Sequence, residues 1–384
     1  MSGRPDLRLA ERGGWIECLR APAMLFGAIA RARGFLYSRG VLPSFDVGTP
    51  VVSVGNLVAG GTGKTPMIVW LARELAANGR VVGLVSRGYR GAGEDLDGGG
   101  AASDSTSGDG ARNGNDEARM LADMLPGVLH IQDRDRVDAA RRLADAGVDV
   151  ILMDDGFQHR RLSRDLDVVL VDALRPYGLP APSGGGAPVE AFLPRGLLRE
   201  PLTALRRAHA VVLTRTDAVS QADVSALETR IQRAAPGVPI ARSEHRPTGL
   251  RVLDGDSTAS SLALAELVGR DVDLFSGIGN PGAFEETVRA LGASIVEHRA
   301  FGDHHGFSSA DLAGLGGARP ALTTAKDAAR LRLQSTVEAP DPLWVLDVEL
   351  SLTSGGDALR SLLASLPESA ASRVRGSIHE GLHG

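Results

Sequence analysis

Short apolar runs alternate with helical segments along most of the chain. Residues 51–54 are apolar, a glycine-rich stretch follows, and a helix is predicted from about residue 65 to residue 78. Such alternation of buried strands and helices is typical of βαβ units and predicts a parallel sheet. The other elements predicted in this part of the chain are strands at 80–85, 148–153, 167–171 and 210–214, and helices at 115–124 and 137–146.

A second α/β pattern begins after residue 270. It comprises predicted strands at 272–275, 293–297, 321–324 and 344–350, and a predicted helix at 282–291. The length of 384 residues also suggests two domains, at roughly 150 residues per domain. We therefore predict a first domain at 1–240 and a smaller α/β domain at 241–384, with an extended linker near 241–255.

Two segments rich in glycine and proline interrupt this pattern. In residues 91–115, 8 of 25 residues are glycine, and Leu96 is the only large apolar one. This segment can bury too little surface to offset its ordering entropy, which predicts a flexible loop. Residues 177–188 form a smaller loop of the same kind.

The composition limits the classes of function. Hydrophobic residues make up 43% and charged residues 23%, as in soluble globular proteins. Sparse aromatic residues (4%) and a net charge of −5 argue against a nucleic acid partner. The single cysteine, Cys18, excludes an intramolecular disulfide and a cysteine-based zinc site. Without an apolar run of roughly 18 residues or a signal peptide, the bulk of the protein is predicted to be cytoplasmic.

The segment of residues 12–40 is basic and amphipathic. It holds five arginines and one acidic residue. Its apolar positions near one helical face are Trp15, Leu19, Phe26 and Ile29. The pattern fits a helix that lies on an anionic membrane surface. Periodicity alone favours the alternative, a helix that packs on its own domain and leaves its arginines in solvent, because helices that face a core are the commoner case.

The strongest chemical signal is a phosphate loop after the apolar run at 51–54. Its residues are Gly60, Gly61, Thr62, Gly63, Lys64 and Thr65, and a predicted helix follows directly. Glycines let backbone N–H groups surround phosphate oxygens, and the helix N-terminus adds partial positive charge. In such a loop Lys64 reaches the β- and γ-phosphates of ATP, and the hydroxyl of Thr65 is a ligand of Mg²⁺. The loop departs from the strict pattern at Val58, and Ala59 replaces the additional lysine of partitioning ATPases.

The predicted strand at 148–153 ends in two aspartates, Asp154 and Asp155. An apolar strand that ends in acid beside a phosphate-loop strand is the Walker B arrangement, in which a carboxylate holds Mg²⁺ directly or through water. Two neighbouring carboxylates also favour a cation between them. The alternative is that both aspartates cap the following turn.

Other polar residues are less specific by themselves. Asp116 begins a predicted helix, where aspartate is a common N-cap. His304 and its neighbour His305 fit either a general base that works with a carboxylate or an ordinary loop histidine. Arg87 and Arg199 follow apolar stretches in loops, where they either meet anions or are solvated.

Together these segments resemble the tetraacyldisaccharide 4′-kinase family of lipid A biosynthesis. The resemblance covers roughly residues 15–350, and the motifs occur in family order. They are the phosphate loop at 54–66, Ser-Arg-Gly-Tyr at 86–89, Asp-Glu-Ala at 116–118, Asp-Asp-Gly-Phe-Gln-His at 154–159, Leu-Arg-Glu-Pro at 198–201, Ser-Gly-Ile-Gly-Asn-Pro at 276–281, Asp-His at 303–304 and Thr-Thr-Ala-Lys-Asp-Ala at 323–328. The Asp-Asp-Gly-Phe-Gln-His motif combined with this phosphate loop is close to diagnostic.

The resemblance implies transfer of the γ-phosphate of ATP to the 4′-hydroxyl of a tetraacyl-glucosamine-disaccharide 1-phosphate. It implies that Asp116 is the catalytic base, that His304 assists it, and that Asp154 and Asp155 serve Mg²⁺. It also implies a peripheral protein on the inner face of the cytoplasmic membrane. The basic N-terminal helix would then dock on anionic lipid and meet the acyl chains of the substrate.

We therefore expect a P-loop nucleoside-triphosphate-hydrolase-like parallel-sheet domain with a second, smaller α/β domain. The first supplies the phosphate loop, the metal carboxylates and Asp116, and the second supplies His304 across an interdomain cleft. Two alternatives remain at this point. A P-loop switch ATPase would show hydrolysis stimulated by a protein partner, and a soluble small-molecule kinase would be active without detergent or lipid.

Overall fold

The structure is a computed structural model of the whole chain. It describes residues 5–88, 120–122, 124–182, 185–253, 260–279, 281–302, 305–334 and 336–369. The chain divides into two compact units: unit 1 comprises Met1–Gly114, Met124–Glu244 and Ser351–Gly384, and unit 2 comprises Asn115–Asp123 and His245–Leu350. Both are built on parallel strands with helical connections, so the predicted α/β class is confirmed.

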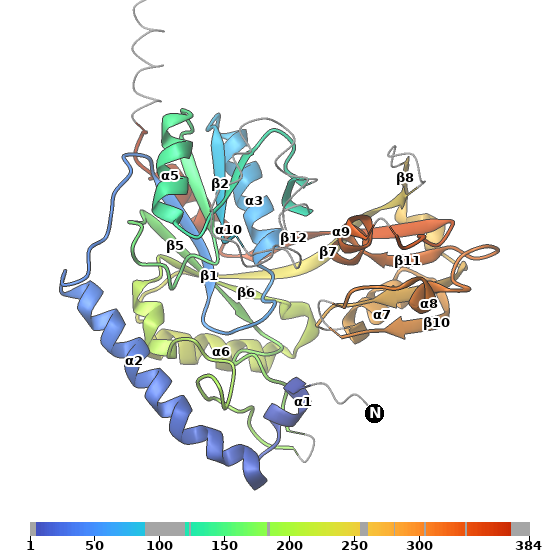
Figure 1. Cartoon of the computed structure of the whole chain (residues 1–384), viewed down its shortest axis with the longest axis horizontal. Coiled ribbons are helices and arrows are strands. Elements are labelled where there is room, and N and C mark those ends of the chain that lie inside the picture. Colours follow the sequence, from blue (N-terminus) through green and yellow to red (C-terminus); the bar gives the residue numbers. More distant parts are fainter. Residues whose placement is uncertain are drawn as a thin grey trace, which may run out of the picture. The chain divides into compact units, whose positions relative to one another are not determined.

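A parallel sheet forms the centre of unit 1 (Figure 1). Its strands, in spatial order, are β7 (Ile240–Leu253), β6 (Ala210–Thr214), β5 (Leu166–Asp172), β1 (Val51–Asn56), β4 (Val150–Asp154), β2 (Val82–Ser86) and β3 (Leu129–Gln132). Every residue of β1 is buried, because this strand lies between β5 and β4 and is covered on both faces. The phosphate loop follows β1 and therefore lies at the carboxyl edge of the sheet, where ligands of such folds bind.

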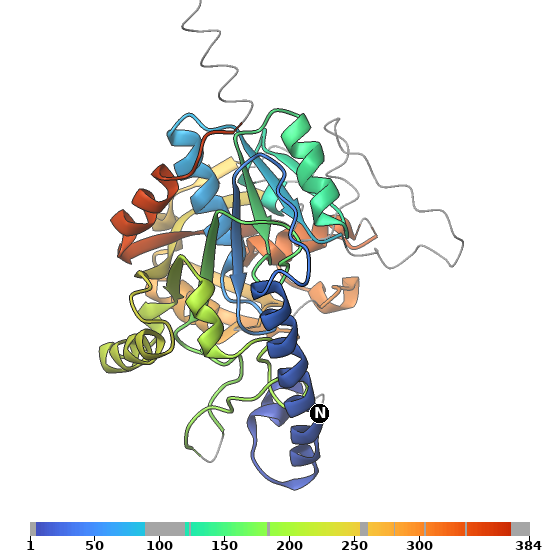
Figure 2. The same cartoon turned by 90° about the vertical axis from the view of Figure 1, so that its left-hand side faces the viewer.

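Helices cover both faces of this sheet. α3 (Lys64–Ala77) and α10 (Gly356–Ala364) lie on one side and α5 (Arg136–Asp145) on the other (Figure 2). Val137, Ala140 and Leu143 of α5 pack on apolar residues of β1, β2 and β4. α6 (Gln221–Ala234) contributes to a further apolar cluster with β5 and β6, which includes residues of the phosphate-loop approach.

The N-terminal part of unit 1 is helical. α1 (Pro5–Ala10), the 3₁₀ helix η1 (Gly14–Leu19) and α2 (Arg20–Ser38) project away from the sheet (Figures 1 and 2). The helix predicted within residues 12–40 is thereby confirmed. Among the residues described, no helix has both the length and the apolar character needed to cross a membrane.

Unit 2 has its own parallel strands in the order β10 (Ser294–Ala300), β9 (Asp271–Ser276), β11 (Ala321–Thr324) and β12 (Leu343–Ser354), and β8 (Ser260–Leu262) pairs antiparallel with β7. The helices are η5 (Leu264–Leu267), α7 (Pro281–Ala290), α8 (Ser309–Leu312) and α9 (Ala325–Leu333). Leu274, Leu322 and Trp344 belong to its apolar core. The strands and the helix predicted for this part of the chain are confirmed.

Two features of the structure differ from the expected organisation. The extended linker near 241–255 is largely β7, a strand that crosses the boundary between the units at residue 244. The residues after Leu350 belong to unit 1, although the second domain was expected to run to the C-terminus. α10 contacts α3 of this unit: Arg360 pairs with Glu74, and its guanidinium lies over the ring of Trp70.

Candidate active site

The phosphate loop connects β1 to α3 through residues with glycine-type backbone angles. Gly60 has φ 132° and Gly63 has φ 86°, values that side chains rarely tolerate. A Cβ atom added to Gly60 or Gly61 would meet no atom of the described residues within 4 Å, so the backbone here borders open space. α3 begins at Lys64 directly after this backbone, and the first N–H groups of a helix have no partner within the helix. This geometry is that of an anion cradle.

Side chains behind the loop hold its carbonyl oxygens. Asn56 donates from Nδ2 to the carbonyl oxygen of Gly60 (3.2 Å) and to Oγ1 of Thr62 (2.9 Å). Two residues at the end of β6 complete the set: Thr214 Oγ1 donates to the Thr62 carbonyl (3.0 Å) and Arg215 Nη2 donates to the Gly61 carbonyl (2.7 Å). Because these carbonyls are held from behind, their dipoles do not oppose a phosphate in the cradle, and the loop is preorganised for an anion.

Two cations converge on Asp155 beside the loop. Lys64 Nζ lies 3.5 Å from Asp155 Oδ1, and Arg199 Nη1 donates to Oδ1 and Oδ2 at 3.0 and 2.8 Å. Burial opposes ionisation of this carboxyl, but Lys64 and Arg199 outweigh burial and hold the pKa of Asp155 below its ordinary value. Arg136 also donates to the backbone carbonyl of Asp155 at 2.9 Å. The carboxylate is thus charged at neutral pH and keeps two phosphate-seeking cations at the loop.

Asp154 ends β4 and lies in register with Val54 of β1, one strand away from the phosphate loop. Among the described residues, no cluster of three or more His, Cys, Asp or Glu side chains could hold a metal by itself. Mg²⁺ does not need such a cluster, because it is usually bound by one or two carboxylates together with phosphates and water. The donors present, a hydroxyl at Thr65 and carboxylates at Asp154 and Asp155, are hard oxygen ligands that fit Mg²⁺.

The turn after β4 is packed tightly against β1. A Cβ on Gly55 would lie 2.6 Å from Phe157 Cβ, and a Cβ on Gly156 would lie 2.6 Å from Ser53 Oγ. Phe157 is fully buried in the cluster that includes Leu57 of the phosphate-loop approach. The Asp-Asp-Gly-Phe segment is therefore locked to the strand that carries the phosphate loop.

The two predicted acid–base residues, Asp116 and His304, lie outside the described residues, as does the whole loop at 91–115. The neighbouring His305 is described: its Nε2 lies 3.1 Å from Asp311 Oδ2, and its ring stacks on Phe301 at 4.5 Å. His305 therefore has a structural role in unit 2. Arg87, the other arginine considered from the sequence, is exposed after β2.

Comparison with known proteins identifies the family of this chain. Residues 15–367 match the model of the LpxK family, tetraacyldisaccharide-1-P 4′-kinase. A tetraacyldisaccharide 4′-kinase of Anaeromyxobacter sp. (strain K) is 41% identical over 379 residues, which cover 94% of this chain and 95% of the relative. One of Aeromonas salmonicida (strain A449) is 34% identical over 93% of this chain and 94% of the relative. The chain belongs to the tetraacyldisaccharide 4′-kinase family.

A solved structure supports the same assignment. The crystal structure of LpxK from Aquifex aeolicus in complex with ATP has a TM-score of 0.66 and 27% sequence identity, and the match covers 91% of this chain and 99% of that chain. As a member of the family, the chain is an ATP-dependent kinase of lipid A biosynthesis, a transferase that uses ATP with Mg²⁺. The switch-ATPase alternative is not favoured.

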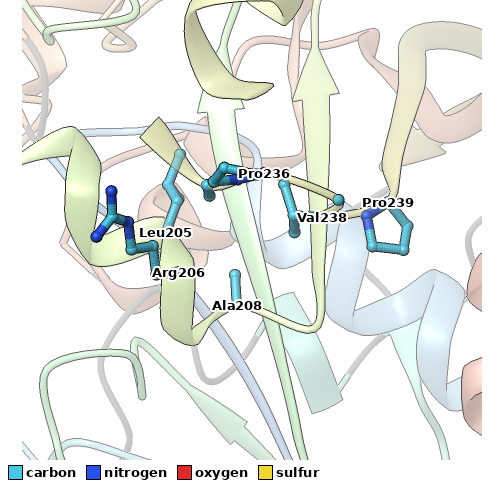
Figure 3. Close-up of a pocket in the computed structure, with 8 residues that line it drawn as sticks. Leu205, Arg206, Ala208, Pro236, Val238 and Pro239 are labelled. Atoms are coloured by element: carbon cyan, nitrogen blue, oxygen red, sulfur yellow. The ribbon is translucent and has the colours of Figure 1, made fainter. Parts of the chain in front are cut away.

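Sequence reasoning missed several residues that shape this kinase's phosphate loop. Thr214 is the last residue of β6 and Arg215 follows it, about 150 positions after the loop, and Asn56 is the last residue of β1. No sequence motif indicated Thr214 or Arg215, and the left-handed φ of 59° at Arg215 is visible only in the structure. Asn56 lies within the motif at 54–66, but its contacts with Gly60 and Thr62 were not predicted. A shallow pocket of about 380 Å³ lies elsewhere, between η3 (Leu202–Arg207) and the amino ends of β6 and β7 (Figure 3). It is at the opposite edge of the sheet from the phosphate loop.

Proposed function

We propose that this kinase transfers the γ-phosphate of ATP to the 4′-hydroxyl of a tetraacyl-glucosamine-disaccharide 1-phosphate, with the phosphate loop as its ATP site. The backbone of residues 60–63 would hold the phosphates, and Lys64 would face the β- and γ-phosphates. The observation that carries this assignment is the convergence of Lys64 and Arg199 on Asp155 next to the glycine cradle. Phosphoryl transfer requires mainly positioning and charge neutralisation, and these residues provide both.

Thr65, Asp154 and Asp155 are the residues that would hold Mg²⁺. When bound, Mg²⁺ neutralises charge on the β- and γ-phosphate oxygens. Asp155 has a second task in the absence of nucleotide, because its carboxylate balances the charges of Lys64 and Arg199. ATP phosphates would take over both cations, since they carry more negative charge than one carboxylate.

Asp116 is the proposed base and His304 its helper, as the family resemblance implies. As the 4′-oxygen attacks the γ-phosphorus, its proton passes to the Asp116 carboxylate and the bond to ADP breaks. The contacts of His305 support His304 as the acting histidine of the pair, because Asp311 and Phe301 already engage His305 in unit 2.

The exposed face of the N-terminal helices supports docking on a membrane surface. Their exposed apolar side chains are Trp15 (74% exposed), Met24 (68%), Leu25 (62%), Ile29 (59%) and Phe35 (56%). The face toward the protein is made of small residues, Ala23 and Gly27, which are buried. α2 holds three arginines and no acidic residue, which favours an anionic surface. We therefore assign this kinase to the inner face of the cytoplasmic membrane as a peripheral protein.

The activity is tested by incubating the protein with γ-labelled ATP and the disaccharide 1-phosphate acceptor in detergent micelles. A labelled glycolipid is expected, and the label should resist a phosphatase that is restricted to the 1-position. Hydrolysis of ATP that ignores the glycolipid but rises with a protein fraction would instead favour the switch ATPase. Equal activity on a water-soluble sugar without detergent would favour a soluble small-molecule kinase.

Membrane docking is tested with substitutions on the exposed face. Replacing Trp15, Leu25 and Ile29 together by serine should weaken binding to anionic vesicles while the melting temperature stays close to that of the wild type, since these side chains are in solvent. Deleting residues 1–30 is a less clean test, because it also removes hydrogen-bond acceptors of the buried Arg195. Unchanged vesicle binding by the triple variant would rule out this docking face.

A further inference from the structure

The loop at residues 191–200 forms one wall of the phosphate loop. The Ala59 N–H donates to the Leu197 carbonyl at 2.8 Å, and the Arg199 N–H donates to the Leu57 carbonyl at 2.8 Å. Val58 and Leu198 form an antiparallel bridge between these two hydrogen bonds. Residues 57–59 and 197–199 thus form a short ribbon that ends directly before Gly60, so a shift of the 191–200 loop would move the approach to the phosphate loop.

The same loop is tied to the N-terminal segment by Arg195. This side chain is only 1% exposed. Its Nη1 donates to the Leu9 carbonyl at 2.7 Å, and its Nη2 donates to the Glu11 carbonyl and to Glu17 Oε1, both at 2.8 Å. A buried guanidinium that lost these acceptors would remain as an uncompensated charge, which is strongly destabilising. Residues 9–17 therefore stay fixed to the loop as long as Arg195 keeps its partners.

α2 rests on the loop at a second point. A Cβ on Gly27 would lie 2.6 Å from the Phe192 ring, so any side chain larger than that of glycine would clash with the ring. The guanidinium of Arg31 lies over the same ring, 5.0 Å from its centroid. The loop thus contacts the N-terminal helices at Phe192 and Arg195, and two residues later it pairs with the approach to the phosphate loop.

We propose that the 191–200 loop couples the membrane-docking helices to the phosphate loop, with Arg195 as the positioning residue, so that vesicle binding and ATP binding strengthen each other. The proposal rests on the membrane docking proposed above. In water only a few contacts hold α2 on the loop, because its large apolar side chains are exposed. A bilayer that buried these side chains would hold the helix in one orientation. Because the loop pairs with residues 57–59, holding the helix in one orientation also restricts the approach to the phosphate loop, so ATP binding costs less conformational entropy.

This coupling is reciprocal by thermodynamic necessity. If vesicles raise the affinity for ATP by a given factor, ATP raises the affinity for vesicles by the same factor. Typical coupling between two sites corresponds to a factor of about 5 to 150. The two affinities can be measured separately on the full-length protein, without any turnover of substrate.

The test compares binding of a non-hydrolysable ATP analogue with Mg²⁺ in the absence and presence of anionic phosphatidylglycerol vesicles. In the wild type, vesicles should raise the affinity about fivefold or more. In Arg195→Met, vesicles should change the affinity by less than about twofold, because the tie between the N-terminal segment and the 191–200 loop is lost. Arg12→Met is the matched control: it removes an exposed arginine of the same segment that, within the described part of the chain, donates to the Ala187 carbonyl and not to the 191–200 loop. It should keep the gain.

Other variants separate coupling from simple loss of structure. Arg195→Lys retains a charge and should recover part of the gain. If Arg195→Met lowers the melting temperature sharply, Gly27→Leu answers the same question, because it pushes α2 off Phe192 and leaves Arg195 intact. It should likewise reduce the gain.

The outcomes distinguish the two proposals. Vesicle binding by the wild type with no change in ATP affinity would overturn the coupling and leave the docking intact. Failure of the wild type to bind vesicles would overturn both. A full gain in both Arg195→Met and Gly27→Leu would show that the loop does not transmit the effect.

Discussion

Lys64 is the residue whose loss should be most damaging to the ATP site. It begins α3, its side chain is 18% exposed, and its Nζ lies 3.5 Å from a carboxylate oxygen of Asp155. In the Lys64→Met variant Asp155 keeps Arg199 as a partner at 2.8 Å, so we expect the fold to persist. The change therefore probes the chemistry rather than the stability of the loop.

Two independent magnitudes give the size of the effect. At an effective dielectric constant of about 20, two unit charges about 4 Å apart interact by about 4 kcal/mol. Removing one donor that stabilises developing charge in a transition state lowers kcat by about 10²- to 10³-fold, equivalent to about 2.7–4 kcal/mol. We therefore expect Lys64→Met to lose about 10²- to 10³-fold in kcat/KM for glycolipid phosphorylation.

The assay is transfer of label from γ-labelled ATP to the glycolipid acceptor in micelles. Arg73→Met is a matched control, since it removes a positive charge from the exposed face of the same helix and should change the rate little. The composition offers a second readout, because Lys64 and Lys326 are the only lysines in the chain. An acyl-phosphate derivative of ATP, which acylates amines close to bound phosphates, should label Lys64 and should be displaced by ATP.

Two results would refute the reasoning. One is a Lys64→Met enzyme within about twofold of the wild-type rate, because a lysine that faces the transferred phosphate cannot be dispensable. The other is labelling that ATP does not suppress or that falls only on Lys326, which would place the nucleotide elsewhere.

The remaining predictions concern the carboxylates and their partners. Asp154→Asn and Asp155→Asn should each shift the Mg²⁺ titration of activity to higher concentration, because an amide is a weaker hard-cation ligand, and two unchanged titrations would favour the turn-capping alternative. Arg199→Met removes a cation that holds the pKa of Asp155 low, so the acidic limb of the pH–rate profile should move to higher pH; a limb that stays in place or moves down would contradict this. Asp116→Ala should lower kcat strongly and leave ATP affinity nearly unchanged, and near-normal turnover would favour the N-cap interpretation. If Asp116 and His304 act as a unit, the double variant should be far less impaired than the product of the two single losses, whereas multiplicative losses would indicate independent roles.

The sequence alone predicted the parts of the fold that depend on local signals. The apolar run at 51–54, the glycines that follow, and Lys64 with Thr65 at a helix start are contiguous, so their pattern identified the phosphate loop. The apolar strand that ends in Asp154 and Asp155 was recognised for the same reason. Other elements were not predicted, among them β3, α6, α9 and α10. Propensity over a short segment is a weak signal by itself.

Tertiary structure alone decided which distant residues meet. Neighbouring parallel strands are separated in sequence by their crossover connections. The residues around the phosphate loop therefore did not predict that Thr214 and Arg215 donate hydrogen bonds to its carbonyl oxygens. In the same way, the sequence did not indicate that Arg199 pairs with Asp155.

The N-terminal helix illustrates the limit of a hydrophobic pattern. Its periodicity identified an apolar face but left open whether protein or a membrane surface covers it, because both environments select the same spacing of apolar residues. In the structure the small residues Ala23 and Gly27 meet the protein, while Trp15 and Ile29 remain exposed. Amphipathicity is a property of the helix by itself. Which face of the helix packs on the protein depends on the shape of the protein surface that it contacts. Here that surface is the ring of Phe192, and only glycine can approach it so closely.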